Sequence, residues 1–122
     1  MATKSEVIQY LKNIYKDLKQ DGEGYTLTLN VGDGRTQLAI INVTDEFLMA
    51  SSPFAKVGQI SDSQAIAASN VAAAITTLGS YYVTTRAMWI RDIDPSEVQF
   101  VIEFTMAAAD NLEKDLGLGD AM

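Results

Sequence analysis

The stretch 24-GYTLTLNVGDGRTQLAIIN-42 decides the fold. Its first half alternates large apolar residues with small polar ones, and this period of two predicts a strand with one buried face over Tyr25 to Val31. Gly32, Asp33 and Gly34 tolerate positive φ, so Arg35 to Asn42 is predicted to fold back as a hairpin partner. The same three residues resemble a phosphate loop, but they lack the nucleotide-binding spacing and precede a strand, which favours the hairpin turn.

The hairpin is flanked by a helix on one side and a further strand on the other. Apolar residues recur every three or four positions from Lys4 to Lys19, and Thr3 with Glu6 has the spacing of a capping box. After a turn at residues 44–46, Phe47 to Ser52 is predicted to complete an antiparallel meander of three strands.

The second half is predicted to hold two more helices. Residues 53–60 form a loop, and the capping-box spacing of Ser61 and Gln64 opens a helix to Leu78 that is rich in alanine, so a neighbour can approach it closely. Residues 80–85 and 87–91 are β-like and make two strands or one long bent strand. Asp94 as N-cap and Pro95 begin a helix to about Leu116, and residues 117–122 form a frayed tail.

These elements predict an α+β fold class. A three-stranded antiparallel meander and one or two late strands form a sheet, and the N-terminal, middle and long C-terminal helices pack on it. At 122 residues the chain has the usual length of one domain, so residues 1–122 are predicted to be a single domain.

Composition excludes several classes of function. The chain has no histidine and no cysteine, so neither a His-based catalytic triad nor the usual zinc site can form. We therefore expect no enzyme activity and no cofactor. A net charge of −7 repels nucleic acid and anionic membranes, so neither is an expected partner. The absence of cysteine and of an apolar core in the first ten residues predicts a cytoplasmic protein.

One acidic group precedes the last helix. Asp92, Asp94 and Glu97 lie within six residues, so they could bind a hard cation or act as acid and base. Helix capping explains two of the three and is the favoured interpretation. With Arg86 or Arg91, the same carboxylates define the alternative function, a small-molecule or metal-ion-sensing domain.

A second acidic group lies near the end of the last helix. Asp110, Glu113 and Asp115 carry negative charge where it slightly opposes the helix dipole. The pattern is typical of a solvated face, and the alternative is an acidic patch for a basic partner.

The last helix is apolar around most of its circumference. One stripe of apolar residues suits packing on the sheet, and a second set projects elsewhere: Val98, Val101, Ile102, Ala109 and Leu112 against Phe100, Phe104 and Ala107. The second set needs the N-terminal helix or another subunit as cover, or else stays exposed beside an intramolecular core. Phe100, Phe104 and Trp89 are the candidate apolar binding surface.

The element order and three stretches carry a family resemblance. The stretches are 48-LMASSPF-54, Asn70 in the middle helix, and the run from 91-RDID-94 through Phe104 to 109-ADNLE-113. With them the chain resembles the YbjN family and the related type III secretion chaperones. The resemblance implies a non-enzymatic homodimer in contact through the middle helix and the neighbouring strand, with Ala68, Ala72, Ile75, Tyr81 and Tyr82 at the interface. It also implies the predicted function, a dimeric chaperone-like regulator or adaptor that binds a peptide or protein client.

Overall fold

The computed structural model describes residues 2–32, 34–69 and 74–118 of the chain. The described residues form an α+β fold of three helices and one six-stranded antiparallel sheet, in the strand order β1-β2-β3-β4-β6-β5. The elements are α1 (Lys4–Ile14), β1 (Lys19–Asp21), β2 (Gly24–Gly32), β3 (Arg35–Val43), β4 (Phe47–Lys56), α2 (Asp62–Ser69), β5 (Ala74–Leu78), β6 (Tyr81–Trp89) and α3 (Pro95–Asp115). The predicted fold class is confirmed.

The hairpin of β2 and β3 forms as predicted. Tyr25 lies opposite Ile41 and Leu27 opposite Ala39, and all four side chains are buried. Gly32 and Gly34 have φ angles of 104° and 73°, which a residue with a side chain rarely adopts. Asp33 lies outside the described residues. Alternation along the two strands thus fixes which face of the sheet is buried.

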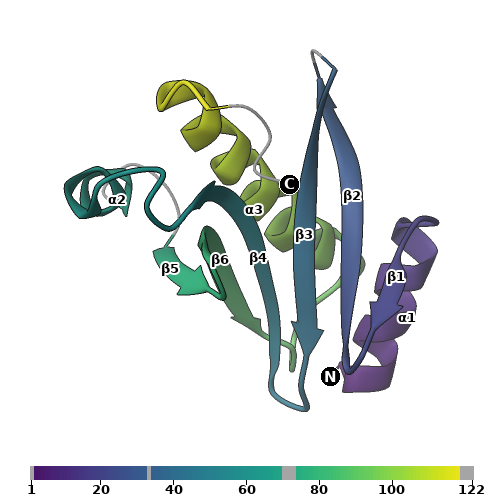
Figure 1. Cartoon of the computed structure of the whole chain (residues 1–122). Coiled ribbons are helices and arrows are strands. Elements are labelled where there is room, and N and C mark those ends of the chain that lie inside the picture. The colour runs from purple at the N-terminus through teal and green to yellow at the C-terminus, as the bar shows by residue number, and fades with distance from the viewer. Residues whose placement is uncertain (1, 33, 70–73, 119–122) are drawn as a thin grey trace.

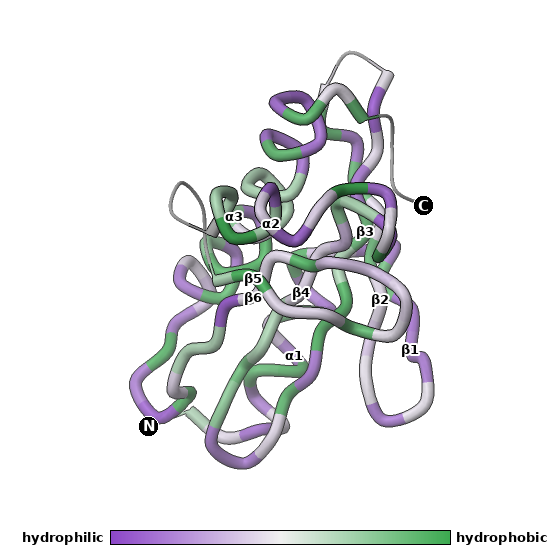
Figure 2. The backbone as a smooth tube through the Cα atoms, turned by 60° about the vertical axis from the view of Figure 1, so that its left-hand side comes forward, coloured by the Kyte–Doolittle hydropathy of each residue, from purple (hydrophilic) through white to green (hydrophobic). Residues whose placement is uncertain are grey.

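All three helices pack on the same face of the sheet. Figure 1 shows α3 running behind the strands, and contacts join α3 to α1, β3, β4 and β6. The larger apolar core lies between the sheet, α1 and α3, and includes Val7, Leu11, Ile41 and Ile102. A smaller core around Phe54 joins β4, α2 and the C-terminal half of α3. In Figure 2 the short edge strand β1 is hydrophilic, whereas β4 and the adjoining strands carry hydrophobic stretches.

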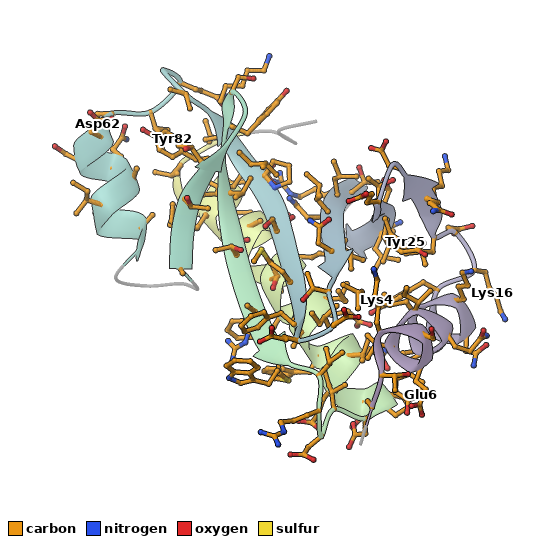
Figure 3. The ribbon with its side chains drawn as sticks, turned by 90° about the horizontal axis from the view of Figure 1, so that it is seen from below. Lys4, Glu6, Lys16, Tyr25, Asp62 and Tyr82 are labelled. Atoms are coloured by element: carbon orange, nitrogen blue, oxygen red, sulfur yellow. The ribbon has the colours of Figure 1, made fainter. Side chains whose placement is uncertain are left out.

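The first helix is shorter than predicted. Its capping box is present, since the Thr3 hydroxyl accepts from the Glu6 backbone N–H and the Glu6 carboxylate accepts from the Thr3 N–H. The helix ends at Ile14 instead of Lys19, because the chain then turns and Lys19–Asp21 pairs with Thr26–Gly24 as β1. In Figure 3, Glu6 lies on the side of α1 away from the strands and Lys4 projects from the opposite side of the helix, and both side chains are exposed. Tertiary pairing thus takes the last residues of the predicted helix into the sheet.

The predicted middle helix over residues 61–78 is wrong in its second half. Ser61 and Gln64 make the expected reciprocal bonds, but α2 is described only as far as Ser69. Ala74–Leu78 is the edge strand β5, whose β-branched Ile75, Thr76 and Thr77 lie opposite residues 82–84 of β6. The late β-like region is one unbroken strand, β6. Asn70 and Ala72 lie outside the described residues.

The predicted loop at Pro53 is also wrong, because β4 continues to Lys56. A bulge at Phe54 interrupts the pairing of β4 with β6. On the other side, the ladder between β3 and β4 ends at the Ile40–Ser51 pair. There the Gln37 side chain donates to Ser52 Oγ and to the Pro53 carbonyl, at 2.9 and 2.7 Å. A proline is tolerated in this inner strand because side chains replace the missing ladder bonds.

Candidate functional site

The acidic group before α3 is a helix cap. The Asp94 carboxylate accepts a hydrogen bond from the Glu97 N–H at 2.8 Å, and the Glu97 carboxylate accepts one from the Asp94 N–H. The Ser96 hydroxyl donates to Asp94 at 2.6 Å, and this bond together with the backbone bonds lowers the pKa of Asp94. Asp92 and Glu97 line a shallow hollow of about 270 Å³ that Arg91 shares. Of the two arginines that the sensing alternative allowed, Arg91 lies at this hollow and Arg86 lies at α3, and Asp94 is not among the residues that line the hollow.

The acidic group near the end of α3 is not a solvated face, and that prediction is wrong for two of its three residues. Asp110 is 4% exposed and Glu113 is fully buried, whereas Asp115 is exposed. Arg35, at the start of β3, donates to Asp110 at 2.7 Å and to Glu113 at 3.4 Å. An acidic patch for a basic partner is excluded at Asp110 and Glu113, because their charges already serve to hold the β2–β3 hairpin against α3.

Lys114 completes this cluster. Its ammonium lies 3.1 Å from the second carboxylate oxygen of Asp110, one helical turn away. Burial raises the pKa of Asp110, but the hydrogen bonds from Arg35 and Lys114 outweigh it and hold that pKa below its ordinary value. Nothing in the sequence marks this cluster, because the cation and the carboxylates lie 75 or more positions apart.

The two predicted sets of apolar residues on α3 are confirmed. Val98, Val101, Ile102 and Ala109 are fully buried against the sheet and α1, and Leu112 is 4% exposed. On the other side of the helix, Phe100 is 50% exposed and Phe104 is 40% exposed. α1 does not cover these two rings, since their contacts are with each other and with Arg86.

Phe100, Phe104 and Ala107 form a continuous exposed track along α3, which we call the α3 stripe. The Phe100 and Phe104 rings stack with centroids 5.3 Å apart. The guanidinium of Arg86, on β6, lies 5.4 Å from the first centroid and 4.9 Å from the second, in cation–π range. Beyond Phe104 the stripe enters a groove of about 430 Å³ lined by Phe104, Ala107, Ala108, Asn111, Leu112, Lys114 and Asp115.

Trp89 does not belong to this site, although the sequence grouped it with Phe100 and Phe104. Arg86 and Met88 of β6 point toward α3, so the alternating residue Trp89 points to the opposite face of the sheet. There it is 58% exposed and packs on Phe47, its cross-strand partner, with ring centroids 4.3 Å apart. The predicted apolar surface is therefore two surfaces, one on each side of β6.

The predicted dimer residues fall partly inside the chain's own core. Ala68 is 5% exposed and packs in the smaller core, and Ala72 lies outside the described residues. Ile75 and Tyr82 line an open hollow of about 460 Å³ between α2 and β5, and Tyr81 is half-buried. The Tyr82 hydroxyl donates to Asp62 at 3.0 Å, which raises the Tyr82 pKa (Figure 3). Ile75 and Tyr82 thus hold α2 against β5 and β6, whereas Tyr81, opposite Lys56, lies on the other face of the sheet.

The part of the chain that the structure describes lacks both a metal-binding cluster and a membrane-spanning helix. In residues 2–32, 34–69 and 74–118, no group of three or more Asp or Glu is arranged to hold a metal ion. No helix within these ranges is long and apolar enough to cross a membrane. Comparison with known proteins finds no family model and no curated protein that matches this chain. The resemblance to the YbjN family thus stays a prediction from the sequence.

Proposed function

We propose that this protein is a non-enzymatic, dimeric adaptor that binds an extended or amphipathic segment of another protein. The α3 stripe is the observation that carries this proposal. Two stacked phenylalanines at 50% and 40% exposure are unusual for a helix in contact with water, because a soluble surface normally places polar residues there. An apolar partner side chain on this stripe would remove both rings from water.

The α3 stripe and the groove together run along one helix and set the length of segment that can bind. From Phe100 to Leu112 the residues span twelve positions of one helix, or about 18 Å at 1.5 Å per residue. The groove is mainly apolar and ends at Lys114 and Asp115, one charge of each sign. This suits a short segment that inserts apolar side chains at intervals and places polar groups at its end.

The position of Arg86 lowers the entropy cost of binding at the α3 stripe. Its guanidinium is held over both rings, so part of its side-chain entropy is lost before a client arrives. Such preorganisation favours equilibrium binding, and the proposal needs no chemical step from any residue. The acidic field of the chain would speed the encounter with basic clients, so added salt should slow association more than it weakens the complex.

The relationship to the YbjN family and the secretion chaperones, the homodimer and a cytoplasmic location are part of the same proposal. The order of elements supports the first, since a helix, strands, a short helix, two strands and a long helix follow one another as in the resemblance. The absence of cysteine suits a reducing compartment. A small-molecule sensor remains the alternative, with the hollow at Arg91, Asp92 and Glu97 as its site.

A peptide library tests the function. We expect apolar and amphipathic peptides to bind the wild-type protein, and Phe104→Ala to weaken binding by roughly threefold to eightfold. Fully burying an exposed phenylalanine is worth about 1.5–3 kcal/mol, and Phe104 is 40% exposed before a peptide binds. The matched control is Phe47→Ala on the opposite face, which should bind as the wild type does. Equal loss in both variants, or no binding peptide beside a stabilising small molecule, would overturn the adaptor function.

A further inference from the structure

The sheet has one face that none of the described helices covers. Since α1, α2 and α3 all pack on the other side, this open face is bare in Figure 1. Its residues follow from the strand register and the alternation of side chains. On the five strands from β2 to β5 they are Thr26, Thr28, Asn30, Thr36, Leu38, Ile40, Asn42, Phe47, Met49, Ser51, Pro53, Lys56, Tyr81, Val83, Thr85, Ala87, Trp89, Ala74, Thr76 and Leu78. Ser51, Pro53 and Val83 are buried, and the others are half-buried or exposed.

Lys56, at the end of β4, is the one charged residue of this set, although one residue in five of the chain is charged. On the edge strand β1, Lys19 lies opposite Thr26 and Asp21 lies opposite Gly24, so the charges of this face stand at its margins. Arg86 of β6 points to the helix side. A face open to water is the cheapest place for a charged side chain, so the absence of charge from its centre calls for a reason.

The half of this face near the β3–β4 turn is apolar apart from Asn42, which lies opposite Met49. Trp89 and Phe47 stack there, Met49 lies opposite Ala87, and Ile40 is diagonal to Met49. Trp89 is 58% exposed and Met49 42% exposed. An apolar centre with charges only at the rim is the pattern of a protein–protein interface.

We propose that the open face is the interface between two copies of this chain, packed sheet against sheet about a two-fold axis. In such a contact the same surface meets itself, so a charge near the axis would meet its own copy. Two chains that each carry a net charge of −7 repel one another, and only a neutral face allows them to approach closely. A basic or acidic partner would find nothing on this face to pair with, which favours a second copy.

The size of the face suits a dimer. Five strands about 4.8 Å apart and roughly eight residues long, each rising about 3.3 Å, give a projected area of roughly 600 Å². Side-chain relief adds to that value, and a stable interface takes about 800 Å² from each partner. The interface rests on the homodimer of the proposed function but not on client binding, and it leaves the α3 stripe of each protomer free on the outside of the dimer.

A pair of charge-insertion variants tests the position of the interface. Met49→Glu puts a carboxylate at an exposed site in the apolar centre, and Ile66→Glu does the same on α2, where Ile66 is 67% exposed. Both sites are exposed, so both variants should fold, which circular dichroism can verify. Light scattering should give twice 13.2 kDa for the wild type and Ile66→Glu at tens of micromolar, and 13.2 kDa for Met49→Glu.

Trp89 supplies a second measurement, because it is the only tryptophan in the chain. In a dimer of this kind acrylamide should quench its fluorescence less at high protein concentration than at low, and Met49→Glu should remove the difference. A monomeric wild type overturns the proposal, and so does a dimer that Ile66→Glu disrupts and Met49→Glu leaves intact. A dimeric wild type that Met49→Glu dissociates but that binds no peptide would overturn client binding and leave this interface standing.

Discussion

The two faces of the sheet differ in where they carry charged residues. On the covered face, Glu113 is fully buried and Asp110 nearly so, both in ion pairs with Arg35. On the open face, where water would solvate any charge, the strands from β2 to β5 carry only Lys56, at one margin. A buried charge persists only when it is paired, whereas an exposed face without charge at its centre points to a requirement other than stability. The comparison separates residues that hold the fold from residues available for function.

The largest expected difference is between two methionines, one on each face. Met106 of α3 is 1% exposed in the larger core, and Met49 is 42% exposed on the open face. Met106→Ala should lower the free energy of unfolding by about 2–5 kcal/mol, because it leaves a cavity. Met49→Ala should lower it by less than about 1 kcal/mol. Urea denaturation at low protein concentration measures both, and equal losses would contradict the assignment of the faces.

The buried ion cluster provides the second comparison, between two arginines. Arg35→Ala should destabilise the protein by about 3 kcal/mol, because it takes the guanidinium away from the fully buried Glu113 and leaves Asp110 with Lys114. Arg91 is exposed, so Arg91→Ala should change stability by no more than about 0.5 kcal/mol. Thermal and urea denaturation of the two variants measure both changes in stability. A loss in Arg35→Ala no larger than in Arg91→Ala would show that the hairpin does not depend on this cluster.

The smallest expected effect is a dependence on pH. The pKa of Asp110 is lower in the folded protein than in the unfolded chain, where an aspartate has a pKa of about 3.9. Its contribution to stability is therefore complete above that value and is lost as pH falls through the lower, folded pKa. Asp110→Asn should be less stable than the wild type by on the order of 1 kcal/mol at neutral pH. The gap should close in acid, and a constant gap down to about pH 2 would argue against this linkage.

The ends of helices and the central hairpin could be predicted because their signals are local. Thr3 with Glu6 and Asp94 with Glu97 make the capping boxes that their spacing indicates. Tyr25 and Leu27 are buried as their alternation requires. Hydrogen bonds in these motifs join residues a few positions apart, so the sequence contains both partners side by side.

The candidate sites were predicted only in part. The width of the apolar surface on one helix predicted that Phe100 and Phe104 project away from the sheet-facing stripe and left open what covers them. Their separation from Trp89 depends on which way β6 faces. The ion cluster of Arg35 could not be found from the acidic residues alone, because a carboxylate on a helix has the same local pattern whether it is solvated or paired across the fold. The open face required the full strand order.

By itself, the sequence determined the α+β class, the hairpin, the helix starts and the shortage of catalytic groups. Only the tertiary structure decided that Ala74–Leu78 is a strand, since Ile75, Thr76 and Thr77 follow an alanine-rich segment and become β5 by pairing with β6. It also decided that β4 runs through Pro53, and that Lys19–Asp21 joins the sheet. In each case a partner strand distant in sequence supplies hydrogen bonds that outweigh the local preference, and local patterns contain no information about such a partner.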